Sequence, residues 1–524
     1  MPRRTLLLAA AVTVAAAVLY GTRLGQVPAY LMHDELQFAL QAQSIASSGR
    51  DLSGRVLPVF FTEPEFPAGR DPAIIYATAA LLTVVPLSDW SARLPTALIS
   101  AVSVVLVFLI ARRLFASDWL ALVSAGLLAF TPAHFIRGRL VLSPQYAIPI
   151  VLAWLLALVL FSERATVRRL GAAAAWIGLS AYTYLASVVM MPVYLAWTLW
   201  WGGRRLGRRA AVVAAVAFVV PLVPMAAWYV THPERTSQIV SAYRLADAAG
   251  GGFGGATVVA AIRDKVGLLW SFFSPAFLFV SGDSSLTNST RQVGFFPLAF
   301  VVLLPVGVYQ LARARQPITW IILAGLATAP LAALLTGALE MNRLLLAIPF
   351  GVLTASYGMA ALVTSRARAW RAIGVLLAVS VPIQFAGFYS DYMGRYRVDS
   401  AHWFGGNTRD LFNAAIARAG VDSGVQVLVS DAIPFAERYW RFYALASDRP
   451  DLIDRMERYA PGQAGAARAG TLLACPLSTA ECQDLIANPA AWRQVTMVAE
   501  LAGSPSFALL ERTANEIREP GQPQ

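Results

Sequence analysis

The chain alternates between long apolar runs and short polar connections. Uncharged stretches of about 17 residues or more, long enough to cross a bilayer as helices, recur from the N-terminus to near residue 390. Candidate spans lie near residues 6–20, 94–111, 119–133, 144–161, 170–184, 185–201, 210–230, 294–312, 317–335, 344–363 and 370–388. The pattern predicts a mainly α-helical, polytopic membrane protein with about eleven spans.

Arginine clusters in the connections predict the orientation of these spans. They are Arg3-Arg4, Arg112-Arg113, Arg164 with Arg168-Arg169, Arg204-Arg205 with Arg208-Arg209, Arg313 with Arg315, and Arg366 with Arg368 and Arg371. All fall on one side only if a further apolar stretch, 72–87, does not cross the membrane. Because positive loops stay inside, we place the clusters and the N-terminus in the cytoplasm. Segment 72–87, interrupted by Pro72 and Pro86, is then interfacial.

This topology puts most of the polar chain on the outer face. We predict a transmembrane domain over residues 1–389, with large outer loops at 21–93 and 231–293, and an extracytoplasmic α/β domain over 390–524. The second loop contains the glycine tract 250–255. The tail pattern predicts strands near 425–429, 471–474, 495–498 and 507–510 and a helix over 435–445.

Composition agrees with a membrane protein, since 57% of the residues are hydrophobic, 14% are charged and the mean hydropathy is +0.58. Topology explains the net charge of +12 better than nucleic-acid binding does. The first apolar run has no small-residue cleavage site after it, so we interpret it as a retained span rather than a signal peptide. Cys475 and Cys482 favour a local structural disulfide outside the cell over two free thiols.

Candidate chemistry gathers at the predicted outer ends of the spans. Asp34 and Glu35 follow the first span and begin a segment with apolar residues at helical spacing. Other polar residues at outer ends are His33, Arg137, Arg139, Asp283, Asn288, Arg291, Glu340, Asn342 and Arg343. The middles of the spans contain almost no ionisable residue, and the two halves show no matching broken helices. Both observations disfavour a transporter.

Several stretches in this order resemble one family. They are the Asp34-Glu35 pair after the first span, the Tyr182-Thr183-Tyr184 stretch, Gly282-Asp283 followed by Ser289 to Gly294, Asn342-Arg343 with Pro349, and the aromatic run Phe385 to Tyr396. Together they resemble the GT-C membrane glycosyltransferases, and within them glycosyltransferase family 39, the relatives of protein O-mannosyltransferases and of the lipid A aminoarabinose transferase. The resemblance covers roughly residues 5–396.

The resemblance implies an enzyme that moves a sugar from a polyprenyl-phosphate donor to a protein, lipid or glycan acceptor. The first-loop Asp of that family is the catalytic base, which corresponds to Asp34, with Glu35 beside it. Two positions depart from the family pattern. The loop after the third span, residues 134–139, lacks a second acid, and Thr287-Asn288 stand where Arg-His is expected. Glu63, Glu65 or Asp71 in the first loop is a candidate replacement for the missing acid.

The residue types suit this chemistry. A carboxylate takes the proton of an attacking hydroxyl, and arginine binds the leaving phosphate through two parallel hydrogen bonds. We therefore assign Arg137, Arg139, Arg291 and Arg343 to the donor phosphate, and give supporting roles to His33, Asp283, Asn288, Tyr182 and Tyr184. Each assignment has a simpler alternative. Asp34 could cap the following helix with Gln37 as its partner, and the arginines could contact lipid headgroups. The tyrosines could be packing residues.

Three alternative functions stay open at this point. They are a polymerase or ligase of lipid-linked glycans, a flippase or transporter of such glycans, and an inactive scaffold that presents the tail domain. Asp34 and Glu35 are also able to bind a divalent ion, although the sequence offers no full ligand set and we assign no metal site. The expected partners are the lipid-linked sugar donor, the acceptor and membrane lipids, and the expected location is the inner membrane of a bacterium.

Overall fold

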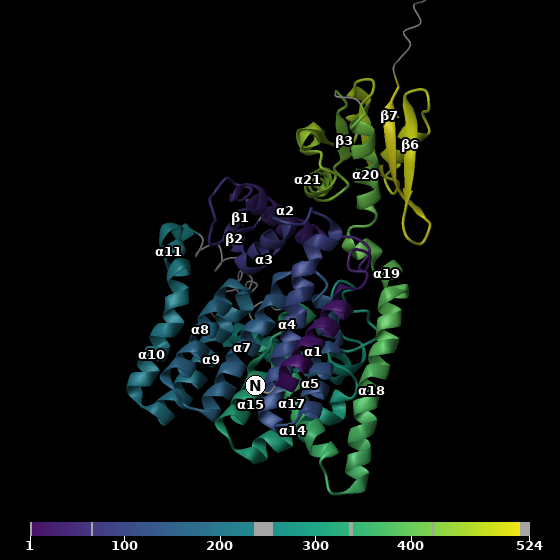
Figure 1. The fold of residues 1–524 in the computed structure, drawn as a ribbon. Helices are drawn as coiled ribbons and strands as arrows, with labels where there is room; N and C mark the ends of the chain where they lie inside the picture. Colours follow the sequence, from purple (N-terminus) through teal and green to yellow (C-terminus); the bar gives the residue numbers. More distant parts are fainter. Residues whose placement is uncertain (1–2, 64–65, 235–254, 335–338, 422–423, 514–524) are drawn as a thin grey trace, which may run out of the picture.

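The apolar runs form a bundle of helices, and a mixed α/β domain stands over one end of it (Figure 1). The computed structural model describes residues 3–63, 66–234, 255–334, 339–421 and 424–513. The helices of the bundle are α1 (Arg3–Gly21), α4 (Asp89–Phe115), α5 (Asp118–Ala129), α7 (Ala147–Glu163), α8 (Val167–Leu179), α9 (Leu185–Leu206), α10 (Arg208–Val219), α11 (Val223–Thr231), α14 (Phe300–Ala314), α15 (Pro317–Thr328), α16 (Leu331–Leu334), α17 (Ala347–Val363) and α18 (Arg368–Met393).

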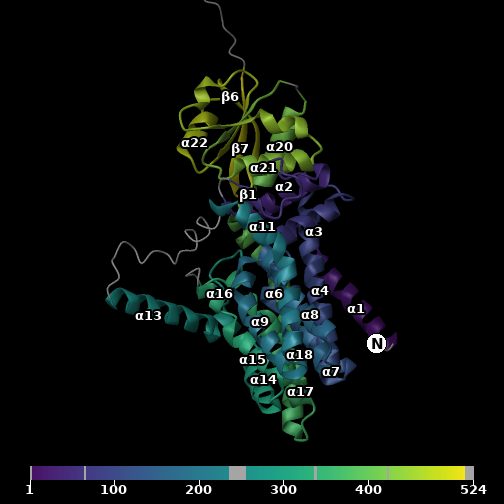
Figure 2. The ribbon, with the colours of Figure 1, turned by 90° about the vertical axis from the view of Figure 1, so that its left-hand side faces the viewer.

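Each of the eleven predicted spans overlaps a helix. In the described part of the chain, seven helical stretches are long and apolar enough to cross a membrane, among them Asp89–Phe115 and Arg368–Asp399. The shorter apolar helices are α3 (Pro72–Leu82), α5, α14 and α17. Helix α13 (Gly255–Phe272) projects from the side of the bundle (Figure 2). The glycine tract that precedes it lies outside the described residues, apart from Gly255.

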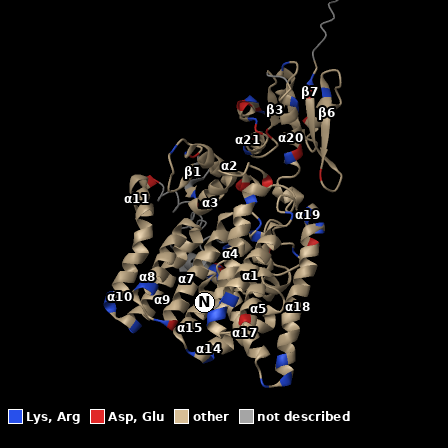
Figure 3. Ribbon diagram, viewed as in Figure 1, with Lys and Arg blue, Asp and Glu red and all other residues tan. Residues whose placement is uncertain are grey.

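The bundle separates charge in the manner expected of a membrane protein. Figure 3 shows charged residues at both ends of the bundle and few in the band between them. At the end away from the α/β domain, Asp118 pairs with both Arg4 and Arg112, and Arg113 pairs with Glu163. Four helix ends therefore meet at this end of the bundle: the start of α1, the end of α4, the start of α5 and the end of α7. This is the arginine-rich end that the sequence predicts to face the cytoplasm.

The helices pack closely where glycine removes a side chain. On α14 and α17, Gly307 lies against the backbone of Thr354, and Gly358 lies against the carbonyl of Leu303. A Cβ atom at either glycine would collide with the neighbouring helix. Small residues permit such close approach between apolar helices, and dispersion contacts then hold the two together.

The first loop forms a cover over one end of the bundle. It contains α2 (His33–Ser48), the antiparallel strands β1 (Phe61–Glu63) and β2 (Phe66–Arg70), and then α3. The two strands were not predicted from the sequence. The short helices around this end are α6 (Pro132–Arg137), η1 (Ser143–Tyr146), η2 (Ser180–Tyr182), η3 (Val220–Leu222), the π-helical turn η4 (Ala276–Val280) and η5 (Met341–Arg343).

The tail folds around a five-stranded sheet with the strand order β4-β3-β5-β7-β6. The predicted strands are confirmed as β3 (Val427–Ser430), β5 (Leu472–Pro476), β6 (Trp492–Ala499) and β7 (Pro505–Arg512), and the predicted helix as α21 (Ala436–Ala446). Strand β4 (Met456–Tyr459) was missed. Strand β4 lies at the edge of the sheet and pairs with β3 alone, so its residues do not alternate clearly between buried and exposed. The remaining elements are α19 (Arg395–Asp399), η6 (Ala401–Phe404), α20 (Thr408–Ala419), η7 (Pro450–Arg455), η8 (Ala464–Ala466) and α22 (Ala480–Ile486).

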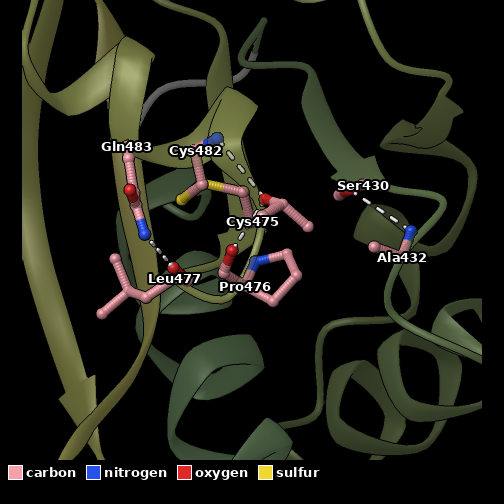
Figure 4. The surroundings of a disulfide bond; sticks show 8 residues. Ser430, Ala432, Cys475, Pro476, Leu477, Cys482 and Gln483 are labelled. Atoms are coloured by element: carbon pink, nitrogen blue, oxygen red, sulfur yellow. Dashed lines mark hydrogen bonds between the residues drawn. A yellow bond between two sulfur atoms is a disulfide. The ribbon is translucent and has the colours of Figure 1, made fainter.

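A disulfide joins Cys475 at the end of β5 to Cys482 in α22 (Figure 4). Both cysteines are fully buried. Thr479 caps α22 by accepting a hydrogen bond from the backbone N–H of Cys482. The bond therefore fixes the turn between the central strand and the helix that covers it.

A buried ion pair attaches the first loop to the bundle. Glu35 on α2 and Arg93 near the start of α4 have no exposed surface. Arg93 donates from Nε and Nη2 to the two carboxylate oxygens of Glu35, at 2.9 and 3.0 Å. Arg93 also donates to the carbonyls of Leu24, Pro28 and Tyr30. One side chain thus fixes the path of the chain from the first span to α2.

We predict that Glu35→Gln destabilises the whole fold. The substitution leaves the Arg93 charge buried without its partner, which costs about 3–5 kcal/mol in comparable sites. Thermal melting of the purified protein in detergent measures the effect, and the variant should melt well below wild type. Glu437→Gln, at an exposed ion pair with Arg458, is the matched control and should melt like wild type. Equal melting of both variants would contradict this role.

The disulfide should stabilise the tail domain. Closing a loop of about eight residues contributes about 2.5 kcal/mol by the loop-entropy relation. We expect Cys475→Ser with Cys482→Ser to make the tail domain of the full-length protein sensitive to protease at a lower temperature than in wild type. Treatment of wild type with a reducing agent should have the same effect. No change under either condition would show that the bond contributes nothing to stability.

Candidate active site

A cavity of about 680 Å³ lies between the cover formed by the first loop and the ends of the bundle helices. Its lining comes from α2, β2 and the start of α3 on one side. On the other side it comes from α6, the start of α9, and the connections around residues 283–288 and 339–343. Six chain segments that are far apart in the sequence, at residues 32–71, 137–144, 181–188, 225–229, 283–288 and 339–343, therefore meet in one space.

Asp34 lies at the first-loop side of this cavity, in the first turn of α2. Its side chain is 40% exposed, and its Oδ1 accepts a hydrogen bond from Nη1 of Arg70 at 3.2 Å. The cap hypothesis for Asp34 is wrong, because Met32 is the N-cap residue and Glu35 accepts from the backbone N–H of Met32. The Asp34 carboxylate is therefore directed toward the cavity rather than toward its own helix.

The α/β domain reaches the neighbour of Asp34. The imidazole of His33 stacks on the ring of Phe435, with centroids 4.2 Å apart and planes 8° from parallel. Nε2 of His33 lies 3.8 Å from Oδ2 of Asp34. Phe435 has a left-handed backbone with φ of 54°, which is unfavourable for a bulky residue and is typical of functional positions. His33 thus connects the tail domain to the carboxylate.

The opposite side of the cavity is built around Asp283. Gly282 adopts a left-handed conformation that turns the chain, and a side chain there would collide with Ser289. Asp283 accepts hydrogen bonds from the backbone of Ser285 and Met341 and from the amide of Asn288. The Asn288 oxygen in turn accepts from Nη1 of Arg137 at 2.8 Å.

Arg137 and Arg343 present their guanidinium groups to the cavity. Arg137 is 3% exposed, and its Nε has no hydrogen-bond partner among the described residues. A buried guanidinium with an unmet donor suits an anion supplied by a ligand. Arg343 donates to the Tyr184 hydroxyl at 3.1 Å and to Glu340 at 3.2 Å. Asn342 beside it also has an unmet buried oxygen within the described part of the chain.

Six of the residues proposed from the sequence line this cavity: Asp34, Arg137, Tyr184, Asp283, Asn288 and Arg343. The other five lie outside its lining. Glu35 is held in the ion pair with Arg93. His33 faces Phe435. Arg139 is fully buried and donates to the carbonyls of Tyr20 and Val27.

Arg291 and Tyr182 are the remaining two. Arg291 is exposed, donates to the carbonyl of Ser284 and lies over the ring of Trp403 at 5.3 Å. The Tyr182 hydroxyl donates to the carbonyl of Pro221. These contacts give both residues a packing role at the edge of the site, and neither belongs to the described lining of the cavity.

Sequence reasoning missed Arg70 and left Asp71 among three candidates. Arg70 ends β2, and Asp71 is the N-cap residue of α3, so both follow from a strand-to-helix turn that was not predicted. Pro72 at the first helical position was the available signal, since proline there marks a helix start. The side chains of Glu63 and Glu65 lie outside those that the structure describes. In the described part of the chain, no three His, Cys, Asp or Glu side chains are grouped to hold a metal ion.

Comparison with known proteins relates this architecture to membrane glycosyltransferases. Residues 67–228 match the family model of dolichyl-phosphate-mannose-protein mannosyltransferases. No curated protein matches the chain. ArnT from Cupriavidus metallidurans in the apo state superposes with a TM-score of 0.59 at 14% identity, over 95% of this chain and 97% of that one. The same protein bound to undecaprenyl phosphate gives 0.58 at 14% identity, over 98% and 99% of the two chains.

A third similar structure is the oligosaccharyltransferase of Archaeoglobus fulgidus in the apo form. It superposes with a TM-score of 0.51 at 13% identity, over 88% of this chain and 65% of that one. At such identities the likeness establishes the fold. The chain therefore has the GT-C glycosyltransferase fold, and its resemblance to glycosyltransferase family 39 is confirmed.

Proposed function

We propose that this protein transfers a sugar from a polyprenyl-phosphate donor to an acceptor hydroxyl or amine at the outer face of the inner membrane. The observation that carries the proposal is the cavity itself, in which a carboxylate and two guanidinium groups face the same space from opposite sides. The likeness to ArnT bound to undecaprenyl phosphate supports a donor of this class.

Asp34 is the group that receives the acceptor proton. Its partner Arg70 orients the carboxylate, and the exposed face of Asp34 is open to a ligand in the cavity. Arg137 and Arg343 hold the phosphate that leaves. Their charge stabilises the anion that develops as the bond from the sugar to the phosphate oxygen breaks.

The cavity also has an apolar side that fits the lipid part of the donor. Phe60, Leu185, Val188, Met225 and Leu339 contribute this surface. Leu185 and Val188 belong to the first turn of α9, a helix long and apolar enough to span the membrane. A polyprenyl chain lying along the outer end of α9 would therefore bring its phosphate toward Arg343.

We predict that Asp34→Asn abolishes transfer while donor binding persists. Removing a general base typically lowers kcat by about 10²–10⁴-fold. The assay is release of polyprenyl phosphate from a polyprenyl-phosphate sugar by the purified protein in lipid, with a mixed acceptor extract. Asp399→Asn, at an exposed acid that pairs with Arg395, is the matched control and should turn over like wild type.

The outcomes of this assay separate the candidate functions. Equal turnover by Asp34→Asn and wild type would exclude Asp34 as the base. If wild type shows no turnover but moves lipid-linked sugar between leaflets, the protein is a flippase and not a transferase.

We predict that Arg343→Gln raises the KM for the donor more than it lowers kcat. The substitution removes a charge-assisted contact to the phosphate, which is worth about 1.5–3 kcal/mol, so the donor KM should rise by at least about tenfold. Arg395→Gln, at a side chain that is 60% exposed outside the cavity, is the matched control. An unchanged donor KM in Arg343→Gln would remove this residue from the phosphate site.

A further inference from the structure

The charges that line the cavity do not balance. Its described lining holds four carboxyl groups, on Asp34, Asp71, Asp283 and Glu340, against three guanidinium groups, on Arg70, Arg137 and Arg343. With all seven ionised, the lining carries one net negative charge. Such a cavity would repel a phosphate in the low-dielectric space between the cover and the bundle.

Three of the four carboxyl groups are matched to an arginine. Asp34 pairs with Arg70, and Glu340 pairs with Arg343. Asp283 is connected to Arg137 through the amide of Asn288. These six side chains include all three guanidinium groups of the described lining. Asp71 is therefore the one carboxyl group of that lining that is not matched to an arginine in this way.

The surroundings of Asp71 are hydroxyl groups. The hydroxyl of Ser143 is close enough to the carboxyl group of Asp71 to favour the ionised form. Although Asp71 is the N-cap residue of α3, its carboxyl group does not accept a hydrogen bond from that helix. It is also close enough to Tyr184 and Tyr229 for their charges to interact. Since Tyr184 accepts from Arg343, Asp71 lies near the phosphate side of the cavity.

Burial raises the pKa of Asp71 to about 7, and this effect outweighs the opposite effects of the Ser143 hydroxyl and of the Arg70 charge. The group is therefore poised to hold or release a proton near neutral pH. The titratable and charged groups that share the cavity with Asp71 are Asp34 and Arg70 from the cover and Arg137, Tyr184, Tyr229, Asp283, Glu340 and Arg343 from the rest of the described lining. His33 lies beside Asp34. Of these, only His33 ordinarily changes charge near neutral pH.

We propose that Asp71 is a donor-binding residue that takes up a proton from water when the donor binds and then donates a hydrogen bond to its phosphate. The inference rests on the proposed function, because it needs a polyprenyl phosphate as the ligand. Protonation of Asp71 leaves three carboxylates and three guanidinium groups, so the incoming phosphate meets a neutral lining. The anion in turn disfavours ionisation of Asp71, which couples donor binding to one proton.

This coupling fixes the sign of the pH dependence. Below pH 7 Asp71 already holds the proton, so the donor binds with full affinity. As pH rises through 7 the proton must be taken up on binding, and affinity falls. If only the protonated form binds, the affinity at pH 8.5 is about 30-fold weaker than at pH 6.

The test measures binding of undecaprenyl methyl phosphate to the full-length protein in nanodiscs at pH 6 and pH 8.5. This probe is a phosphodiester with one constant charge, whereas a phosphate monoester itself titrates near pH 6. We expect wild type to lose affinity by more than about tenfold at the higher pH. Asp71→Asn, which keeps the shape of the side chain and cannot ionise, should bind equally at both pH values.

Two further variants keep the inference testable. His33→Gln should retain the pH dependence of wild type, because it leaves Asp71 intact. Ser143→Ala removes a hydroxyl group that favours the ionised form of Asp71, so the loss of affinity should move to higher pH.

The same pH dependence in Asp71→Asn as in wild type would overturn this inference and leave the proposed function standing. Failure of wild type to bind the probe at pH 6 would overturn the proposed function and this inference with it.

Discussion

The buried pair of Glu35 and Arg93 is the interaction on which the outer half of the molecule depends. Arg93 is anchored on a long helix, and its guanidinium group binds three carbonyls of the preceding connection as well as Glu35. Glu35 also accepts the backbone N–H of Val141, from the loop that follows α6. Three segments therefore converge on one ion pair. Because both charges are fully buried, alternative arrangements would leave a charge without a partner.

This pair places the candidate base indirectly. Asp34 precedes Glu35 on the first turn of α2, so fixing Glu35 inward turns Asp34 toward the cavity. The adjacent carboxyl groups thus have different tasks, one in holding the cover to the bundle and the other in facing a ligand. The difference comes from burial, since Glu35 has no exposed surface and the side chain of Asp34 is 40% exposed.

The α/β domain is part of the same arrangement. Arg409 donates to the carbonyl of Ala29 and pairs with Asp89, and the Tyr439 hydroxyl donates to the carbonyl of Leu31. With the stacking of Phe435 on His33, the domain contacts the chain on both sides of Tyr30 and up to the residue before Asp34. The α/β domain therefore contacts the first loop on its outer side, whereas the Glu35–Arg93 ion pair attaches the same loop to the bundle on its inner side.

The sequence by itself indicated a helical membrane protein, because the length of an apolar run is a property of consecutive residues. It also indicated most tail strands by local pattern, and seven residues of the cavity by their place at the predicted outer ends of spans. Only the tertiary structure decided which polar residues share a space. Arg139 and Arg137 are two residues apart, yet one donates to buried carbonyls and the other faces the cavity. Asp71 meets Ser143 only because the cover folds over the bundle. Such pairings depend on contacts between distant segments, which no local pattern encodes.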